Sequence, residues 1–288
     1  MWELPMNTLE VCLLGDIRVF LNGEPVGSFP TPCSAGLLAY LALNKGHSIH
    51  NDALAARFWP EKPEEQARQE LEDALTRVRS RIEPAGVPPA TFLTANGAGA
   101  CLSKKGVWLD VEEFDGRMAL FRRRLSDRLR LANLEECISL YRGPFMDGHD
   151  HQWCVRERER LRLALLTTLE ILLEYHMEKE EWHLALQTGR TILSHDPLRE
   201  HIHRRLMACH HLMGDRPSAI RQYREFEGLL DEEMGLKPME ATQELLRDIL
   251  AETLRERLWE GAFPAVKAES FAWIRRIRGH GEGQELEE

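Results

Sequence analysis

The sequence predicts a mainly α-helical protein, in which a small N-terminal domain of α+β class precedes an all-α domain of helical repeats. Three patterns support this prediction. Residues 9–14 and 17–21 alternate apolar and polar side chains as short strands do, and residues 51–82 hold two helical patterns joined by a turn. From about residue 112 the pattern is wholly helical and carries a repeat of about 34 residues, the length of a two-helix repeat unit.

The N-terminal strands and the first helix each have a local signal. Asn22-Gly23 directly follows the second strand and is typical of a two-residue hairpin turn. Pro30 and Pro32 mark a turn before a helix expected at residues 33–44, which Gly46 ends. The apolar positions of this helix are Leu37, Leu38, Leu41 and Leu43.

Residues 51–82 are expected to form two helices with a tight turn between them. Asn51 is a favourable N-cap for the first helix, which ends near Trp59-Pro60, and Pro84 follows the second. Apolar side chains of the second helix recur every three or four residues, so one stripe faces a core. The stripe consists of Ala67, Leu71, Ala74, Leu75, Val78 and Ile82. The solvent side is therefore a candidate reading surface.

The helical repeat is clearest between residues 172 and 226. Its aligned pairs are Leu172 and Leu206, Ala185 and Ala219, Leu186 and Ile220, and Ile192 and Phe226. Small alanines let paired helices approach closely, and Asp196-Pro197 ends one hairpin and starts the next. Stacked helix pairs are expected over about residues 117–258, with a groove available to a partner.

Short motifs between residues 58 and 102 occur in a defined order. Phe58-Trp59-Pro60 matches a Leu-Trp-Pro turn, and Thr76-Arg77-Val78-Arg79 matches a Ser/Thr-Arg-Leu-Arg run. Residues 94–102 match a hairpin written Thr-x-x-Gly-x-Gly-Tyr-x-Leu, with both glycines present and Ala100 in place of the tyrosine. These motifs resemble those of the SARP family of bacterial transcriptional activators, whose chains open with an OmpR-type winged helix.

The resemblance continues past the hairpin and covers about residues 9–250. Further matches lie at residues 107–114, 140–145, 157–161, 196–200, 204–207 and 233–238. The resemblance implies two domains, an OmpR-type winged helix-turn-helix DNA-binding domain at residues 9–113 and a bacterial transcriptional activation domain of tetratricopeptide-like repeats at residues 114–258. Residues 259–288 are expected to form a C-terminal helix and a disordered acidic tail, because residues 279–288 are rich in glycine and glutamate.

The resemblance implies a sequence-specific DNA-binding transcriptional regulator that activates promoters. Helix 65–82 would enter the major groove with the wing on the adjacent backbone, and the repeat domain would dimerise or contact the transcription machinery. Double-stranded DNA is the expected partner and RNA polymerase a candidate partner. The chain is expected to bind as a homodimer or as two copies side by side on repeated half-sites, in the cytoplasm.

The candidate DNA contacts lie on the second helix and beside the wing. Arginine suits phosphate and bidentate pairing with guanine, and the amide of Gln69 suits adenine. The competing interpretation is that the arginines are solvated or pair with Glu72, Asp73 or Glu83. The candidate set is Arg68, Gln69, Thr76, Arg77 and Arg79 on the helix, and Lys104 and Lys105 at the base of the wing.

Charge motivates an alternative function. The net charge is −10, and residues 1–110 contain 10 Lys+Arg against 13 Asp+Glu, although DNA affinity depends largely on neutralising phosphates. Pro32-Cys33-Ser34 and Asn96 stand where the family often has basic residues, and Asp73 adds an anion to the reading helix. The alternative is a protein–protein interaction module whose winged helix no longer binds DNA.

The remaining patterns argue against an enzyme, a cofactor and a metal site. Gly97-Ala98-Gly99 lacks the Lys-Ser/Thr of a phosphate-binding loop, and no Gly-x-Ser-x-Gly elbow occurs. The six cysteines are scattered without paired spacing and are expected to be reduced. No apolar run approaches the ~18 residues that span a membrane. No pair at the i,i+4 spacing that would face one zinc ion occurs among the clustered histidines, which are His149, His151, His201, His203, His210 and His211.

Overall fold

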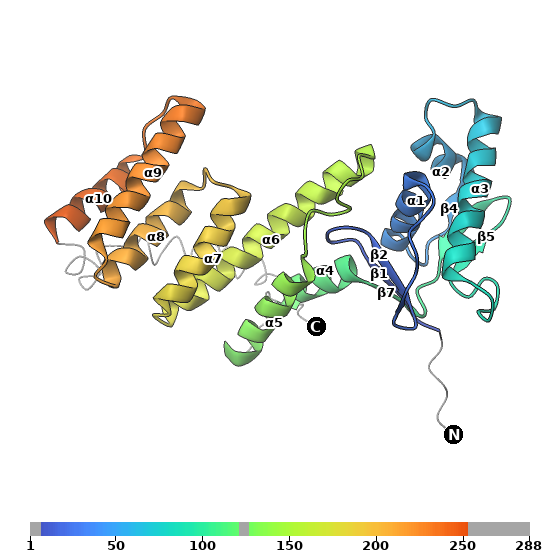
Figure 1. Ribbon diagram of the computed structural model, residues 1–288, viewed down its shortest axis with the longest axis horizontal. Coiled ribbons are helices and arrows are strands. Elements are labelled where there is room, and N and C mark those ends of the chain that lie inside the picture. The colour runs from blue at the N-terminus through green and yellow to red at the C-terminus, as the bar shows by residue number, and fades with distance from the viewer. Residues whose placement is uncertain (1–6, 121–126, 253–288) are drawn as a thin grey trace, which may run out of the picture. The chain divides into compact units, whose positions relative to one another are not determined.

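The described part of the chain, residues 7–120 and 127–252 of this computed structural model, opens with a four-stranded sheet (Figure 1). Its strands in spatial order are β3 (Glu24–Pro25), β2 (Arg18–Leu21), β1 (Leu9–Cys12) and β7 (Val107–Leu109). Strand β1 pairs antiparallel with β2 and parallel with β7. Asn22 and Gly23 have φ angles of 52° and 82°, the left-handed conformation that the predicted two-residue turn requires.

Three helices follow the first three strands. They are α1 (Pro32–Leu43), α2 (Asn51–Phe58) and α3 (Glu64–Ile82). The hydroxyl of Thr31 caps α1 by accepting the backbone N–H of Ser34 at 3.2 Å. The prediction of Asn51 as the cap of α2 is wrong, because His50 holds that position. The Asn51 side chain instead donates to the backbone oxygen of Asn96 at 2.8 Å.

Helix α3 packs on α1 and α2 through the predicted apolar stripe (Figure 1). All six residues of that stripe are buried, and Val78 and Ile82 are fully so. The stripe recurs at three- and four-residue spacing, so the opposite side of α3 is solvent-exposed along its length.

A second, three-stranded sheet closes the N-terminal fold. In spatial order it consists of β4 (Ile49–His50), β6 (Gly99–Leu102) and β5 (Leu93–Ala95), all antiparallel. Strands β5 and β6 form the predicted wing hairpin. A three-helix unit followed by this hairpin confirms the predicted winged helix-turn-helix.

The chain divides into two compact units. Of the described residues, 7–120 and 135–164 belong to the first unit, and 127–134 and 165–252 belong to the second. The first unit therefore takes in residues beyond 113, where the sequence places the end of the winged helix. Helices in the boundary region are α4 (Asp110–Leu120), α5 (Asp127–Leu140) and α6 (Gln152–Glu178).

A buried carboxylate holds part of the first unit together. Asp110 is fully buried, and its oxygens accept the backbone N–H groups of Leu13 and Leu14 at 2.9 Å. The guanidinium of Arg142 donates to the same carboxylate at 3.0 Å. Burial raises the pKa of Asp110, although these hydrogen bonds oppose the shift. The carboxylate thus links the end of β1 to the turn before α6.

An aromatic cluster joins the same turn to the helices of the winged helix. The ring of Trp153 lies edge-on to Tyr40, with centroids 5.2 Å apart, and His151 lies edge-on to Phe58 at the same distance. A Cβ at Gly36 would come within 2.7 Å of His151 Nε2, so only glycine permits this close approach. These aromatic residues pack against one another within the first unit.

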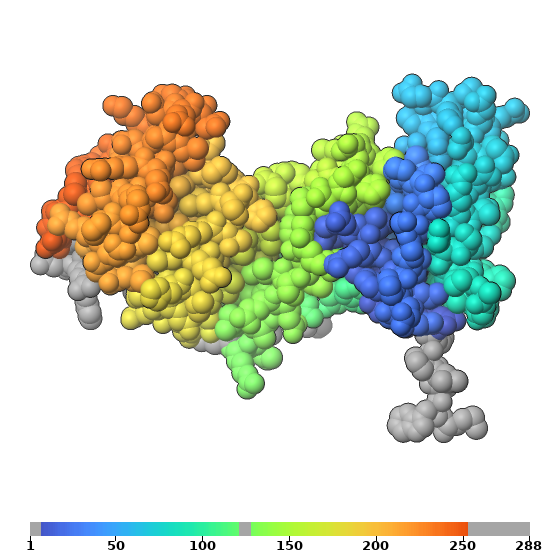
Figure 2. Space-filling model, viewed as in Figure 1, coloured from blue at the N-terminus to red at the C-terminus, as the bar shows by residue number. Residues whose placement is uncertain are grey.

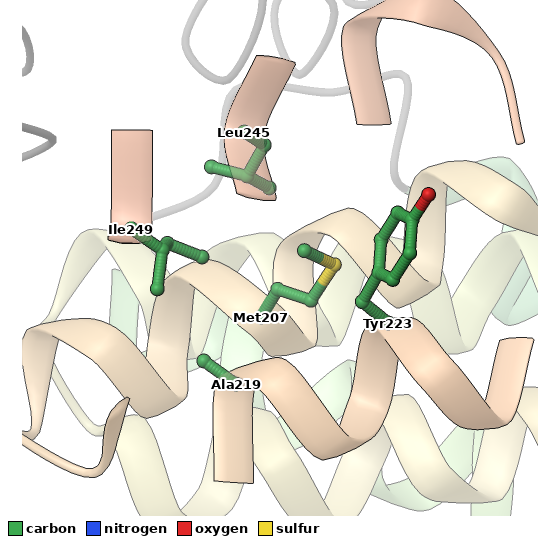
Figure 3. Packing of buried hydrophobic residues seen from close by; sticks show 5 residues of the cluster. All are labelled: Met207, Ala219, Tyr223, Leu245 and Ile249. Atoms are coloured by element: carbon green, nitrogen blue, oxygen red, sulfur yellow. The ribbon is translucent and has the colours of Figure 1, made fainter. Parts of the chain in front are cut away.

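The second unit contains the predicted helical repeat. After the last part of α6 come α7 (Trp182–His195), α8 (Glu200–Leu212), α9 (Arg216–Met234) and α10 (Glu240–Ala251). The aligned alanines at 185 and 219 are both fully buried, as are Ile192 and Phe226 at the next aligned position. Helices α8, α9 and α10 meet in one apolar cluster (Figure 3). It contains Met207, Ala219, Tyr223, Leu245 and Ile249.

The predicted C-terminal helix and acidic tail at residues 259–288 lie outside the described residues. In the part of the chain that is described, no helix is long and apolar enough to cross a membrane.

Candidate nucleic-acid interface

The exposed side of α3 carries a polar ridge opposite its buried stripe. Gln69, Asp73, Thr76 and Ser80 follow one another at three- or four-residue spacing, and all four are exposed. In the space-filling view α3 and the following hairpin, coloured cyan to green, reach the surface on one side of the first unit (Figure 2). Two of the predicted contacts, Gln69 and Thr76, therefore lie where a bound duplex could reach them.

Charge is unevenly distributed along α3. Residues 64–73 contain five carboxylates and one arginine, whereas residues 74–82 contain three arginines and no carboxylate. The arginines of the second half are Arg77, Arg79 and Arg81. Because phosphate attracts cations, the C-terminal half of α3 is the better match to a DNA backbone.

Arg68 is held by carboxylates of its own domain. Its guanidinium donates to Asp52 on α2 at 2.8 Å and lies 2.7 Å from the Glu64 carboxylate one turn earlier on α3. The hydrogen bond that Arg68 donates to Asp52, and then the charges of Asp52 and Glu64, raise the pKa of Arg68. Its positive charge is therefore already balanced, so the pairing alternative holds for this residue, although with partners other than those expected.

Gln69 and Arg77 are less constrained. The Gln69 amide makes only a long contact, 3.5 Å, with the Asp73 carboxylate on the next turn. Arg77 is half-buried and forms no ion pair with any carboxylate of the described residues. Arg81 lies one turn further along the same face, is exposed, and likewise has no ion pair within the described ranges. Arg81 is not among the DNA contacts predicted from the sequence, although its four-residue spacing from Arg77 places both arginines on one face of α3.

Arg79 points toward the wing. One of its terminal nitrogens donates to the backbone oxygen of Leu93 in β5 at 3.4 Å, and its Nε lies 3.8 Å from the Glu83 carboxylate. The Glu83 side chain is only 2% exposed. From the sequence, Glu83 is considered only as a possible ion-pair partner of the arginines. Its position at the end of α3, just before Pro84, is the signal that it could also contact the loop that follows.

The wing hairpin is short and internally braced. The Asn96 side chain accepts the backbone N–H groups of Ala98 and Gly99 at 2.9 and 3.1 Å, which closes the turn. A Cβ at Gly99 would come within 2.7 Å of the backbone oxygen of Ile49, so the second glycine permits β6 to approach β4. Ala100, which replaces the family's tyrosine, is fully buried.

The two wing lysines differ in their surroundings. The alkyl chain of Lys104 packs over Gly46, where a Cβ would come within 2.6 Å of it. Lys105 is exposed, and neither lysine forms an ion pair with a described carboxylate. Both ammonium groups are therefore available to an anionic partner.

The described histidines and cysteines do not come together as a metal site. No group of three or more potential metal ligands comes together among the described residues. His203 is buried, stacks on Phe226, and hydrogen-bonds Pro197 and Gln222 at 2.9 Å through its two ring nitrogens. All six cysteines are free thiols.

Comparison with known proteins identifies the second part of the chain. The family described as bacterial transcriptional activator domain matches residues 109–250. The transcriptional regulatory protein EmbR of Mycobacterium tuberculosis is 24% identical over 240 residues, which cover 80% of this chain and 60% of EmbR. The activator-domain match and the similarity to EmbR support the resemblance to the SARP family. The proteins of that family are transcriptional regulators, which are not enzymes.

Two further relatives match the chain at the same level of identity. The transcriptional regulatory protein MoaR1 of M. tuberculosis is 24% identical over 255 residues, covering 83% of the chain and 78% of MoaR1. The regulatory protein AfsR of Streptomyces griseus is 24% identical over 246 residues, which are 85% of the chain but 25% of AfsR. The chain therefore spans about 60% of EmbR and a quarter of AfsR.

A solved structure supports the fold. M. tuberculosis EmbR, in complex with a low-affinity phosphopeptide, superposes with a TM-score of 0.69 at 22% identity. The match covers 85% of this chain and 66% of the EmbR chain. A winged helix followed by a helical activator domain is therefore the architecture of both.

Proposed function

We propose that this chain is a sequence-specific DNA-binding transcriptional activator. Helix α3 enters the major groove, the β5–β6 hairpin lies on the adjacent backbone, and the helical repeats mediate dimerisation or contact with RNA polymerase. A protein that acts on bacterial promoters works in the cytoplasm. The winged helix occupies residues 9–113 and the activation domain residues 114–258 in this proposal.

The observation that carries the proposal is the exposed face of α3. Its C-terminal half carries Arg77 and Arg81, which form no ion pair with the described carboxylates, next to the polar ridge of Gln69, Asp73, Thr76 and Ser80. Arginine and lysine supply the phosphate contacts, and Gln69 and Thr76 have the chemistry to read base edges. The proposed contacts are Gln69, Thr76, Arg77 and Arg81 on α3, Lys104 and Lys105 beside the hairpin, and Arg68 once it exchanges its carboxylate partners for phosphate.

Fluorescence anisotropy on DNA fragments selected from the host genome tests this proposal. Arg77→Ala is expected to weaken binding and to lower the slope of log affinity against log salt by about one, the loss of one phosphate contact. Arg221→Ala is the matched control, because that arginine is 66% exposed on α9 of the second unit. Equal isotherms for Arg77→Ala and the control would remove α3 from the interface.

A second candidate function rests on the other half of α3. Five carboxylates in residues 64–73, and the neutralised Arg68, favour a winged helix that binds protein instead of DNA. In that case no genomic fragment shifts at low salt, where electrostatic binding is strongest, and a pull-down recovers a protein partner that α3 variants lose.

A further inference from the structure

The Glu83 carboxylate gathers the segment that leads into the wing. Its Oε1 accepts the backbone N–H groups of Phe92 and Leu93 at 2.7 and 2.8 Å, and its Oε2 accepts that of Ala90 at 3.0 Å. A buried carboxylate that accepts three amides fixes the direction of the backbone they belong to, since the amides of the buried residues Phe92 and Leu93 would otherwise lack a partner. Glu83 thus sets where β5 begins.

The backbone between α3 and β5 has a shape that needs this support. Ala90 has a φ of 61°, a left-handed conformation that a non-glycine residue adopts at a cost. Phe92 and Leu93, two and three residues later, are buried. The carboxylate therefore bonds to the unfavourable residue itself and to the two buried residues that follow Thr91, and holds the chain as it turns into the wing.

Arg79 completes this arrangement from α3. It lies one turn before Glu83, and its planar fork faces both the Glu83 carboxylate and the Leu93 carbonyl. The Arg79 side chain is 40% exposed, but its nitrogens are directed at the hairpin. A guanidinium can serve two acceptors in a fixed geometry, whereas an ammonium group cannot reproduce that fork.

We infer that Glu83 is a positioning residue that fixes the β5–β6 hairpin on α3, and that Arg79 acts through this contact and not through DNA. The inference rests on the proposed function, because it concerns how the wing is presented to a duplex. It assigns Arg79, a motif residue of the recognition helix, to the hairpin. Of the two motif arginines, Arg77 and Arg79, only Arg77 then contacts the phosphates of the duplex.

Hydrogen exchange of the full chain tests the positioning directly. In Glu83→Ala, amides of residues 92–102 are expected to exchange about ten-fold faster, while those of α1 are unchanged, because only the local opening becomes easier. Glu83→Gln should give a smaller increase, since one oxygen still accepts two amides. Arg77→Ala is the control and should leave hairpin exchange as in the wild type. Unchanged hairpin exchange in both Glu83 variants would overturn the inference.

The DNA readout separates the two possible roles of Arg79. If Arg79 positions the hairpin, Arg79→Lys should lose DNA affinity and accelerate hairpin exchange as Arg79→Ala does. If Arg79 instead contacts phosphate, Arg79→Lys should keep the wild-type affinity and salt slope, because lysine retains the charge, and the inference is then wrong. The exchange measurement needs no DNA. A chain that binds no fragment would therefore refute the proposed function while the exchange data still decide the role of Glu83.

Discussion

Replacing Asp110 should destabilise the first unit by an amount that the structure predicts. In Asp110→Ala the backbone amides of Leu13 and Leu14 lose their acceptor while remaining buried, and each such loss costs ~1–3 kcal/mol. Arg142 is 32% exposed and can turn to solvent, so it adds little. The wild-type carboxylate is itself desolvated, which offsets part of the loss, and we expect a net cost of about 2–4 kcal/mol. Asp110→Asn keeps one acceptor oxygen and should cost about half as much.

Chemical denaturation followed by tryptophan fluorescence measures this difference, with Glu135→Ala, an exposed carboxylate on α5, as the control. A free energy of unfolding for Asp110→Ala within ~0.5 kcal/mol of the wild type would refute the reasoning. The pH dependence offers a second check. Burial raises the pKa of Asp110 above its ordinary 3.8, so the fold favours the protonated form. The stability that this proton contributes is complete below pH 3.8 and is lost as the pH rises through the raised pKa, a dependence that Asp110→Asn should abolish.

Three further changes have expected outcomes. Gly189→Ala places a Cβ against the buried Leu206 side chain, 3.1 Å from its Cγ, and should lower stability by ~1–3 kcal/mol despite the better helix propensity of alanine; an unchanged melting temperature would contradict this. Asp73→Asn removes an anion from the exposed ridge and should tighten DNA binding two- to three-fold, about 0.5 kcal/mol of repulsion, in the anisotropy assay, whereas Glu232→Gln on α9 should not. Burial lowers the pKa values of His149, His151, His203 and His210, so the neutral rings favour the fold. The stability that these neutral rings contribute is present above pH 6.5 and is lost as the pH falls below that value. A denaturation midpoint that stays constant from pH 7 down to about pH 5 would contradict this expectation.

Much of the fold follows from local signals in the sequence. The buried stripe of α3 is readable because a helix repeats every 3.6 residues, and the Asn22-Gly23 turn because few residues accept positive φ. The alanine pairs of the helical repeat are readable because both repeats need close helix contacts at the same place. Each of these signals lies within one element or one repeat.

The partners of the site residues could not be predicted in the same way. Arg68 bonds Asp52, which is 16 residues away on another helix, and the amide of Leu13 bonds Asp110, which is 97 residues away. Which charges meet depends on how elements pack, and sequence spacing carries no record of that. The sequence therefore predicted which side of α3 is buried and which is exposed, but it could not separate Arg79, whose side chain contacts Leu93 and Glu83, from Arg77, which forms no ion pair with the described residues.

The local distribution of charge resolves the conflict between an acidic molecule and a DNA-binding role. On α3 and beside the hairpin, four cations form no ion pair with the described residues, namely Arg77, Arg81, Lys104 and Lys105. If each neutralises one phosphate, one chain should show a salt slope of about −3.6, and two chains side by side should show about −7. The smaller value corresponds to weak binding at physiological salt, so occupancy of a promoter would require the second copy. A slope near −7 on a repeated half-site, falling to about half on a single one, is what this argument predicts; a slope near zero on both would mean that these cations do not meet phosphate.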